Sequence, residues 1–188
     1  MKNSLWLLLT ILVGSVGLLA QPAGRFTYQG LSAADRQRVD SLCRAMSLEE
    51  KVGQMFVPAV FLQTPAQVSR ALYLIDSCRV GGVSLYRNEP EAVLDFLAQA
   101  QQHSRRVPLL PAMTLERGLA MRLDGTFGYP WPLTMGALGN DTLVYQVGRR
   151  IGEACRQMGI YANFAPSADV NTEPENPIIG VRSFGEDP

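Results

Sequence analysis

Several residue types that mark common classes of protein are scarce in this chain of 188 residues. It has one histidine, His103, and three cysteines, and its 17 basic side chains balance 17 acidic ones. A single histidine without a cluster of cysteines argues against a zinc site. Scattered and balanced charges argue against a nucleic-acid-binding protein. The remaining composition is that of an ordinary soluble protein, and the length predicts one domain of moderate size.

Motifs for cofactors and for nucleophilic serine chemistry are also missing. No strand-like segment is followed by GxGxxG, and no phosphate-binding loop with its lysine is present, so we expect no cofactor. Ser183 has no histidine partner, because His103 lies on the flank of a predicted helix and is expected at the surface. Paired carboxylates for glycoside hydrolysis remain an alternative on residue type, although the sequence alone places no two of them across a sugar bond.

The cysteines leave two interpretations open. Cys43, Cys78 and Cys155 are widely spaced and form no CxxC pair. Two of them could form a disulfide in an exported protein, and the spacing does not say which two. The alternative is that they are buried, unpaired thiols.

The one long hydrophobic run lies in residues 1–20, "MKNSLWLLLTILVGSVGLLA". A lysine, an apolar stretch and then small residues form the pattern of a secretory signal peptide. The stretch is short for a bilayer crossing and small residues interrupt it, which favours a cleaved signal over a membrane anchor. No cysteine follows Ala20, so cleavage as a lipoprotein is not indicated. We expect an exported, periplasmic or extracellular protein without a stable membrane anchor, and a linker over residues 21–31.

From residue 32 onward, helix-like and strand-like segments alternate. The capping box of Ser47 and Glu50 starts a short helix. Apolar segments typical of buried strands are expected at 52–61, 80–86, 107–115 and 160–170. Amphipathic helices are expected at 32–46, 64–78, 89–105 and 140–159. This alternation, with strands that are apolar throughout, predicts an α/β fold with a parallel sheet covered by helices.

Two long connections, 116–139 and 166–188, each follow a predicted strand. Both therefore lie at the carboxyl ends of the strands, where parallel α/β folds bind ligands. Aromatic residues in both connections favour ordered loops. Among their polar side chains, Arg122 and Arg182 offer forks of N–H donors that suit a ligand rich in oxygen. The other candidates are Glu116, Asp124, Asp169, Asn171, Glu173, Glu175 and Asp187.

Read together, several segments resemble glycoside hydrolase family 3, in particular its β-N-acetylhexosaminidase branch. They are "MSLEEKVGQMF", "GGVSLYRN", "LLPAMTLERGLAMRL", "YPWPLTMGALGNDTLVYQVGRRIGEACRQMGI" and "NFAPSADVNTEPENPIIGVRSFGEDP". The resemblance runs from about Met46 to Pro188, and the last two segments are the most diagnostic. It implies a (β/α)8 TIM-barrel type of fold, of which residues 32–188 hold about the first half, four βα units.

The resemblance also implies an activity. Members of the family cleave terminal β-linked sugars with retention of configuration, and this branch typically acts on N-acetylglucosaminides. A carboxylate attacks the anomeric carbon, and a histidine on a loop serves as the acid and base. The expected partner is therefore a carbohydrate substrate.

Three substrate-binding positions follow from the resemblance, residue by residue. Arg122 matches the first substrate arginine and Arg182 the second. The aspartate of the family falls on Thr114, which offers one short hydroxyl where a carboxylate would accept two hydrogen bonds. Residue 117, usually glycine or an aromatic residue in relatives, is Arg117. Both departures lie in the binding motif and predict that the affinity for a sugar differs from the usual one.

The catalytic set of the family maps beyond Pro188, so no catalytic residue is expected within this chain. No histidine follows His103, and the nucleophilic aspartate and the acid/base histidine are both expected later in a longer product. Half a parallel barrel leaves strand edges unpaired. We therefore expect residues 1–188 alone to be a marginally stable, inactive amino-terminal fragment. The alternative is a non-catalytic, truncated or degenerate half-barrel with at most sugar binding.

Overall fold

The structure, a computed structural model, describes residues 28–173 and 175–187. The predicted signal peptide and residues 21–27 of the predicted linker lie outside the described residues. The chain divides into two compact units, Met1–Met46 and Ser47–Pro188. The proposed single barrel domain over 32–188 stays a prediction, and each unit is described by itself.

The first unit consists of one short turn and one helix in its described part. The 3-10 helix η2 (Tyr28–Gly30) precedes helix α2 (Ala33–Ala45), whose N-cap Ser32 accepts a hydrogen bond from the Asp35 N–H. The Tyr28 hydroxyl donates to Asp40 across 2.7 Å. No residue of α2 is buried, so propensity, the cap and these polar contacts support the helix.

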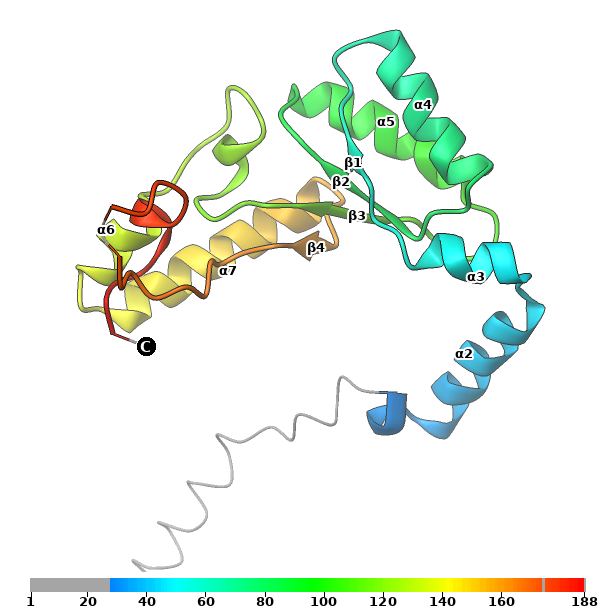
Figure 1. Ribbon diagram of the computed structural model, residues 1–188, viewed down its shortest axis with the longest axis horizontal. Coiled ribbons are helices and arrows are strands. Elements are labelled where there is room, and N and C mark those ends of the chain that lie inside the picture. The colour runs from blue at the N-terminus through cyan, green and yellow to red at the C-terminus, as the bar shows by residue number, and fades with distance from the viewer. Residues whose placement is uncertain (1–27, 174, 188) are drawn as a thin grey trace, which may run out of the picture. The chain divides into compact units, whose positions relative to one another are not determined.

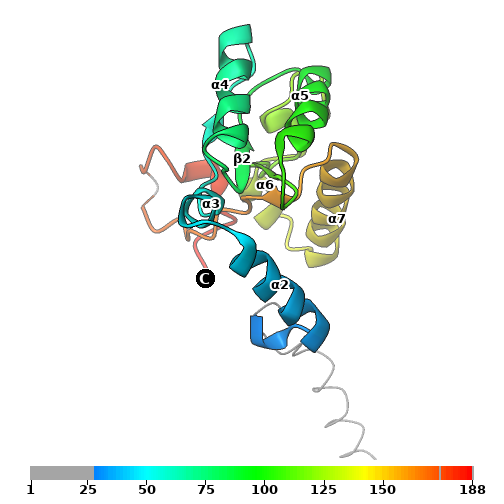
Figure 2. The same ribbon diagram turned by 90° about the vertical axis from the view of Figure 1, so that its right-hand side faces the viewer.

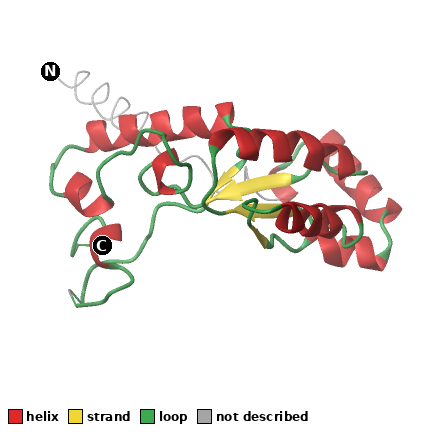
Figure 3. Ribbon diagram, turned by 90° about the horizontal axis from the view of Figure 1, so that it is seen from above, coloured by secondary structure: helices red, strands yellow, loops and turns green. Residues whose placement is uncertain are grey.

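The second unit is built on one parallel sheet. Its strands are β1 (Ala59–Val60), β2 (Gly82–Leu85), β3 (Leu110–Met113) and β4 (Ala162–Asn163). All three pairings are parallel, and the spatial order β1-β2-β3-β4 equals the chain order. Figure 3 shows the strands gathered together with helices running alongside them. The predicted parallel α/β sheet is confirmed. A strand order without reversal is that of a barrel, since doubly wound sheets reverse direction at a switch point.

Helices connect the strands as a parallel sheet requires. Helix α3 (Leu48–Gln54) precedes β1, and the connecting helices are α4 (Pro65–Asp76), α5 (Pro90–His103), α6 (Pro132–Gly136) and α7 (Asp141–Gln157). Thr64 and Gln67 form a capping box at the start of α4, and the Asn140 side chain caps α7 by accepting from the Leu143 N–H. Figures 1 and 2 show α4 and α5 side by side. His103 is the last residue of α5 and is exposed.

The predicted strand over 52–61 is wrong in its first half. Helix α3, opened by the capping box of Ser47 and Glu50, continues through Gln54, and the strand is only Ala59–Val60. Tertiary contact explains the difference: a Cβ at Gly53 would overlap the carbonyl oxygen of Cys78, and the Gly53 carbonyl accepts from the Gly81 N–H. This close backbone approach keeps the apolar Val52 in a helix despite its β-branching.

The core lies on one face of the sheet. Val60, Val83, Leu85 and Met113 point to this face and pack against buried residues of three helices. Those residues are Ala71 and Ile75 of α4, Val93, Phe96, Leu97 and Ala100 of α5, and Ile151 and Cys155 of α7. Burying each large aliphatic or aromatic side chain contributes about 1.5–3 kcal/mol. The helix-covered face therefore holds the unit together.

The opposite face, here called the inner face, carries small residues. Register pairs Ala59 with Ser84, Ser84 with Ala112, and Ala112 with Ala162, so one row crosses all four strands. By the two-residue alternation of strands, Phe61 and Tyr86 follow on this same face at the carboxyl ends of β1 and β2. Both rings are partly exposed. The inner face opens toward the loops.

Candidate functional site

The loop 116–139 is fixed to the carboxyl end of β2 by backbone pairing. Asn88 and Leu123 form a parallel bridge, in which the Asn88 N–H donates to the Arg122 carbonyl at 3.0 Å and the Asp124 N–H donates to the Asn88 carbonyl at 3.2 Å. The buried Asn88 side chain also accepts from Leu62 and donates to the Tyr86 carbonyl. These bonds hold residues 122–124 next to the strand end, so Arg122 is placed by backbone geometry.

Arg122 lies over an aromatic ring at this edge. Its guanidinium carbon is 5.0 Å from the ring centroid of Tyr86, and the Tyr86 ring packs on Phe61 with centroids 5.2 Å apart. A guanidinium over an aromatic face is held by cation–π attraction. The two rings and the arginine thus form a partly exposed platform across the ends of β1 and β2.

Thr114 follows the last residue of β3. Ser84 pairs with Ala112, so Tyr86 and Thr114 occupy equivalent positions two residues further along neighbouring strands. Alternation places both on the inner face, and adjacent strands are about 4.8 Å apart. Among the described residues, no partner accepts from or donates to the Thr114 hydroxyl.

Glu116 and Arg182 form the strongest polar contact of the site. Arg182 Nε lies 3.0 Å from both carboxylate oxygens, and Nη2 lies 2.5 Å from Oε1. The Glu116 side chain is only 1% exposed, whereas that of Arg182 is 34% exposed. The hydrogen bonds from Arg182 to Glu116 raise the pKa of the guanidinium. The pair joins the end of β3 to the 3-10 helix η4 (Gly180–Arg182).

The loop 166–187 is held by its own polar contacts. The buried Ser183 Oγ lies 2.7 Å from the Asp169 carbonyl oxygen and 2.9 Å from that of Gly185, so its one O–H can donate to either, and the Asn171 N–H donates to the Gly185 carbonyl. Ser183 therefore holds the two ends of the loop together. The side chain of Asn176 accepts from Ile178 and Ile179 and shapes the turn before η4.

Helix α6 packs directly against this loop, and Figure 1 shows the two side by side. A Cβ at Gly136 would overlap the carbonyl oxygen of Phe184. Glycine at position 136 is therefore what allows the backbones to meet, and the two long loops support each other at the carboxyl edge.

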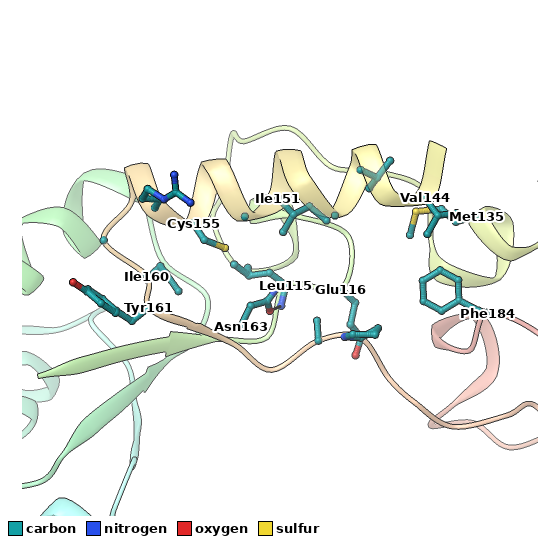
Figure 4. A pocket seen from close by; sticks show the side chains of 17 residues that line it. Leu115, Glu116, Met135, Val144, Ile151, Cys155, Ile160, Tyr161, Asn163 and Phe184 are labelled. Carbon is teal, nitrogen blue, oxygen red and sulfur yellow. Dashed lines mark hydrogen bonds between the residues drawn. The ribbon is translucent and has the colours of Figure 1, made fainter. Parts of the chain in front are cut away.

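A cavity of about 730 Å³ lies on the helix-covered side, between α7 and the last strands. Figure 4 shows Val144, Ile151 and Cys155 of α7 facing Leu115, Ile160 and Asn163 across it, with Glu116 and Phe184 toward one end. The lining is mainly apolar, and the carboxylate at its end is already bound by Arg182. A sugar needs convergent hydrogen-bonding groups, so the inner face is the better candidate for a carbohydrate.

The cysteines are all unpaired. Cys155 is buried and burial raises the pKa of its thiol, but Cys43 and Cys78 are exposed. The interpretation as buried, unpaired thiols is therefore right for Cys155 and wrong for the other two. Within residues 28–173 and 175–187, no three histidine, cysteine or acidic side chains are grouped so as to hold a metal ion.

Arg122, Thr114 and Arg182, the residues predicted to bind substrate, all lie at the carboxyl ends of β2 and β3. Arg122 is held there by the Tyr86 ring, and Arg182 by the carboxylate of Glu116. Thr114 directly follows the last residue of β3. Sequence reasoning missed the platform of Phe61 and Tyr86. The alternation in "GVSLY" carried the signal, since it places Tyr86 on the same face as Ser84. Glu116 was one of many candidates without an assigned role.

A parallel sheet with strands in chain order belongs to the class of (β/α)-barrel proteins, which place their sites at the carboxyl ends of the strands. The family model described as the glycosyl hydrolase family 3 N terminal domain matches residues 47–188. The chain belongs to this family, and both the predicted resemblance and the predicted TIM-barrel type of fold, with about four units present, are confirmed.

Known proteins similar to this chain are considerably longer. Beta-hexosaminidase A of Pseudoalteromonas piscicida is 31% identical over 127 residues, which cover 61% of this chain and 21% of that protein. The beta-N-acetylglucosaminidase/beta-glucosidase of Cellulomonas fimi is 30% identical over 142 residues, 76% of this chain and 24% of that protein. The chain spans about a quarter or less of these relatives.

A solved structure supports the fold. Beta-glucoside phosphorylase BglX bound to 2FGlc superposes with a TM-score of 0.76 at 24% identity, over 84% of this chain and 28% of that one. At this identity the likeness shows the fold alone. It agrees with the four parallel strands in chain order.

Proposed function

We propose that this chain is the amino-terminal part of an exported glycosidase that removes terminal β-linked sugars, typically N-acetylglucosamine, with retention of configuration. Family membership over residues 47–188 supports the class of reaction. The names of the similar proteins, a beta-hexosaminidase and a beta-N-acetylglucosaminidase/beta-glucosidase, support the choice of sugar.

The observation that carries the proposal is the placement of Arg122 and Arg182 at the ends of adjacent strands. Arg122 extends over Tyr86, and Arg182 is oriented by the buried Glu116. Such arginines position hydroxyl and carbonyl oxygens of a sugar for attack at the anomeric carbon. Their part in the reaction is binding and orientation. The nucleophilic carboxylate and the acid/base group that a retaining mechanism requires are proposed to follow residue 188 in a longer product.

Export is proposed from the pattern of residues 1–20. None of the helices formed by residues 28–173 and 175–187 has the length and apolar character needed to cross a membrane. Fractionation of cells that produce the chain with a carboxyl-terminal tag tests the proposal: the expected product lies outside the inner membrane and is shortened by about the length of a signal peptide. A full-length product retained in the cytoplasm would contradict it.

The hydrolase proposal is tested by reading the gene past codon 188 and assaying the complete product with an aryl N-acetyl-β-glucosaminide. We expect the frame to continue into the catalytic aspartate and histidine, and the first released sugar to be the β-anomer. A stop codon after Pro188 would favour the non-catalytic half-barrel. Thr114, which stands where the family has an aspartate, supports that alternative.

For the half-barrel, heating the chain with and without millimolar N-acetylglucosamine decides whether it still binds the sugar, since a bound ligand raises the melting temperature.

A further inference from the structure

Asn88 is a buried polar residue at the carboxyl edge, and its side chain links the ends of two strands. The residue is only 6% exposed. Its Oδ1 accepts from the Leu62 N–H at 3.2 Å, and its Nδ2 donates to the Tyr86 carbonyl at 2.9 Å. Leu62 lies shortly after β1 and Tyr86 directly follows β2. One carboxamide therefore holds both strand ends, through its acceptor and through its donor.

The main chain of Asn88 adds a third segment, the loop 116–139. Its N–H donates to the Arg122 carbonyl at 3.0 Å, and its carbonyl accepts from the Asp124 N–H at 3.2 Å. The Arg122 guanidinium carbon lies 5.0 Å from the centroid of the Tyr86 ring. Asn88 is thus bonded to both members of this cation–π contact, to the tyrosine through its side chain and to the arginine through its backbone.

A carboxamide suits this position because it offers an acceptor and a donor without a charge. Loss of the carboxamide would leave backbone groups of Leu62 and Tyr86 without their partners, and unpaired backbone groups away from water are costly. The strand ends would then have to move to find other partners. Such a movement would separate the Tyr86 ring from Arg122, since the carboxamide holds the Tyr86 carbonyl.

An ion pair connects the same two segments but is exposed. Arg87 Nη2 lies 2.7 Å from Asp124 Oδ1, and the two side chains are 73% and 43% exposed. Water screens the charges of such a pair, so its contribution is small. The buried hydrogen bonds of Asn88 are therefore the stronger constraint on where Arg122 lies.

We infer that Asn88 is a positioning residue, whose carboxamide fixes the Arg122 guanidinium over Tyr86 and so presents it to the substrate. This inference rests on the proposed function, in which Arg122 binds the sugar. Asn88 acts through Arg122 and Tyr86, because its own polar groups are bonded to the protein. Precise placement of a binding group matters because small displacements of a bound substrate reduce the rate strongly.

The first measurement needs no ligand. Protons over the face of an aromatic ring resonate upfield, so the side-chain resonances of Arg122 in the 188-residue chain report its position over Tyr86. Tyr86→Leu gives the resonances of an arginine without the ring. In Asn88→Asp at pH 7 we expect the Arg122 resonances to move toward those reference values. The introduced carboxylate can accept from the Leu62 N–H, but it has no proton to donate to the Tyr86 carbonyl.

Acid should restore the position of Arg122 in this variant. The protonated carboxyl has an acceptor and a donor, as the carboxamide does, and burial raises its pKa above the ordinary value. The Arg122 resonances of Asn88→Asp should therefore return toward those of the wild type as the pH falls from 7 to about 4. The wild type, titrated over the same range, corrects for the titration of other groups.

The second measurement is the affinity for N-acetylglucosamine at pH 7, by calorimetric titration. Asn88→Asp should bind about ten times more weakly than the wild type, which corresponds to the loss of a well-formed hydrogen bond to a charged group. Gln101→Glu is the matched control. The Gln101 carboxamide likewise donates to the Leu109 carbonyl and accepts from the Leu109 N–H, but it does so before β3, at the amino ends of the strands. This variant should lose stability and keep both the Arg122 resonances and the affinity.

Two outcomes overturn the inference. Arg122 resonances in Asn88→Asp that stay at the wild-type values at pH 7 contradict it, because the arginine would then be held by other contacts. An equal displacement in Gln101→Glu also contradicts it, because a loss of stability alone would then move Arg122. If Asn88→Asp does not fold at pH 7, Asn88→Ala, which removes the carboxamide without adding a charge, is measured against the same two criteria.

Failure of the proposed function is a separate result. If the wild-type chain binds no N-acetylglucosamine, the proposal that this edge binds the sugar is contradicted. The ligand-free resonances of Arg122 still decide whether Asn88 positions the arginine.

Discussion

Arg182 donates three hydrogen bonds to the carboxylate of Glu116, although 66 positions separate the two residues in the chain. A fourth bond, from Nη1 to the Ile178 carbonyl at 3.3 Å, fixes the remaining end of the guanidinium. The acid is buried at the end of β3 and the arginine comes from η4. A single ion pair therefore orients a proposed substrate residue and attaches the last loop to the sheet.

The two partners of this pair should differ in their effect on stability. Arg182→Gln leaves a buried carboxylate without its counter-charge, and we expect a loss of about 3 kcal/mol in the free energy of unfolding. Glu116→Gln keeps an acceptor and leaves an arginine that can reach water, so a loss of about 1 kcal/mol is expected. Urea denaturation measures both. Arg87→Gln, which removes an exposed pair, should lower the free energy of unfolding far less than Arg182→Gln, because water screens the charges of an exposed pair. Equal losses for Arg182→Gln and Arg87→Gln would contradict the account of a buried pair.

Glycine 136 should be required for the contact between α6 and the last loop. In Gly136→Ala the new Cβ would overlap the Phe184 carbonyl oxygen, so the loop must move and the melting temperature should fall by several degrees. Gly148→Ala is the matched control, because Gly148 lies inside α7 with nothing within 4 Å of the added Cβ. That substitution should stabilise the protein by about 0.5–1 kcal/mol through helix propensity. A similar effect of the two alanines would show that the contact with Phe184 is absent.

The capping box of α3 should make stability sensitive to acid. The hydrogen bond from the Ser47 N–H, followed by that from Arg106, lowers the pKa of Glu50 from its ordinary value of 4.5. Because the folded state favours the ionised form, this contribution is complete above about pH 4.5 and is lost as the pH falls through the lower folded-state pKa. Glu50→Gln should therefore have a lower urea midpoint than wild type at pH 7. The difference between the two midpoints should be smaller at pH 3.

The control for this pH dependence is Glu91→Gln, since Glu91 is exposed in the first turn of α5 and has no ion-pair partner among the described residues. Its urea midpoint should follow that of the wild type more closely at every pH. If Glu50→Gln and wild type remain separated by the same interval from pH 7 to pH 3, the capping box does not contribute to acid sensitivity.

The three thiols should react at two rates. Cys43 and Cys78 are exposed, whereas burial of Cys155 both shields its thiol and raises its pKa. Because the thiolate is the reactive form, we expect two equivalents of a thiol reagent to react quickly and a third to react roughly ten times more slowly or not at all. Unfolding in urea should release the third, and Cys155→Ala should remove the slow phase. Fewer than two fast thiols would instead favour a disulfide involving Cys43 or Cys78.

Much of the fold was predictable because strong local signals agree with the tertiary structure. The Ser47–Glu50 box, the Thr64 start of α4 and the Asn140 cap are local hydrogen-bonding patterns, and all three form as the sequence indicates. The start of β1 was not predictable in the same way. The helical state of Val52 depends on the approach of Gly53 to the backbone at Cys78 and Gly81, which no local pattern reveals.

The candidate site was likewise predictable in part, from motifs, and unpredictable where it depends on tertiary contacts. Motif resemblance singled out Arg122, Arg182 and Thr114, and strand order explains why they lie at one edge. Their neighbours depend on side-chain geometry in three dimensions: Tyr86 under Arg122, and Glu116 on Arg182.

The most direct test of the account locates the sugar on the folded chain. Isotope-labelled protein is titrated with N-acetylglucosamine at millimolar concentration, and the amide and arginine side-chain resonances are followed by nuclear magnetic resonance. The account predicts that the largest shifts occur at Tyr86, Thr114 and the Nε–H groups of Arg122 and Arg182, while Val144 and Ile151 of the apolar cavity stay unchanged. Shifts confined to Val144, Ile151 and their neighbours along α7 would contradict it, because the ligand would then lie on the helix-covered side of the sheet.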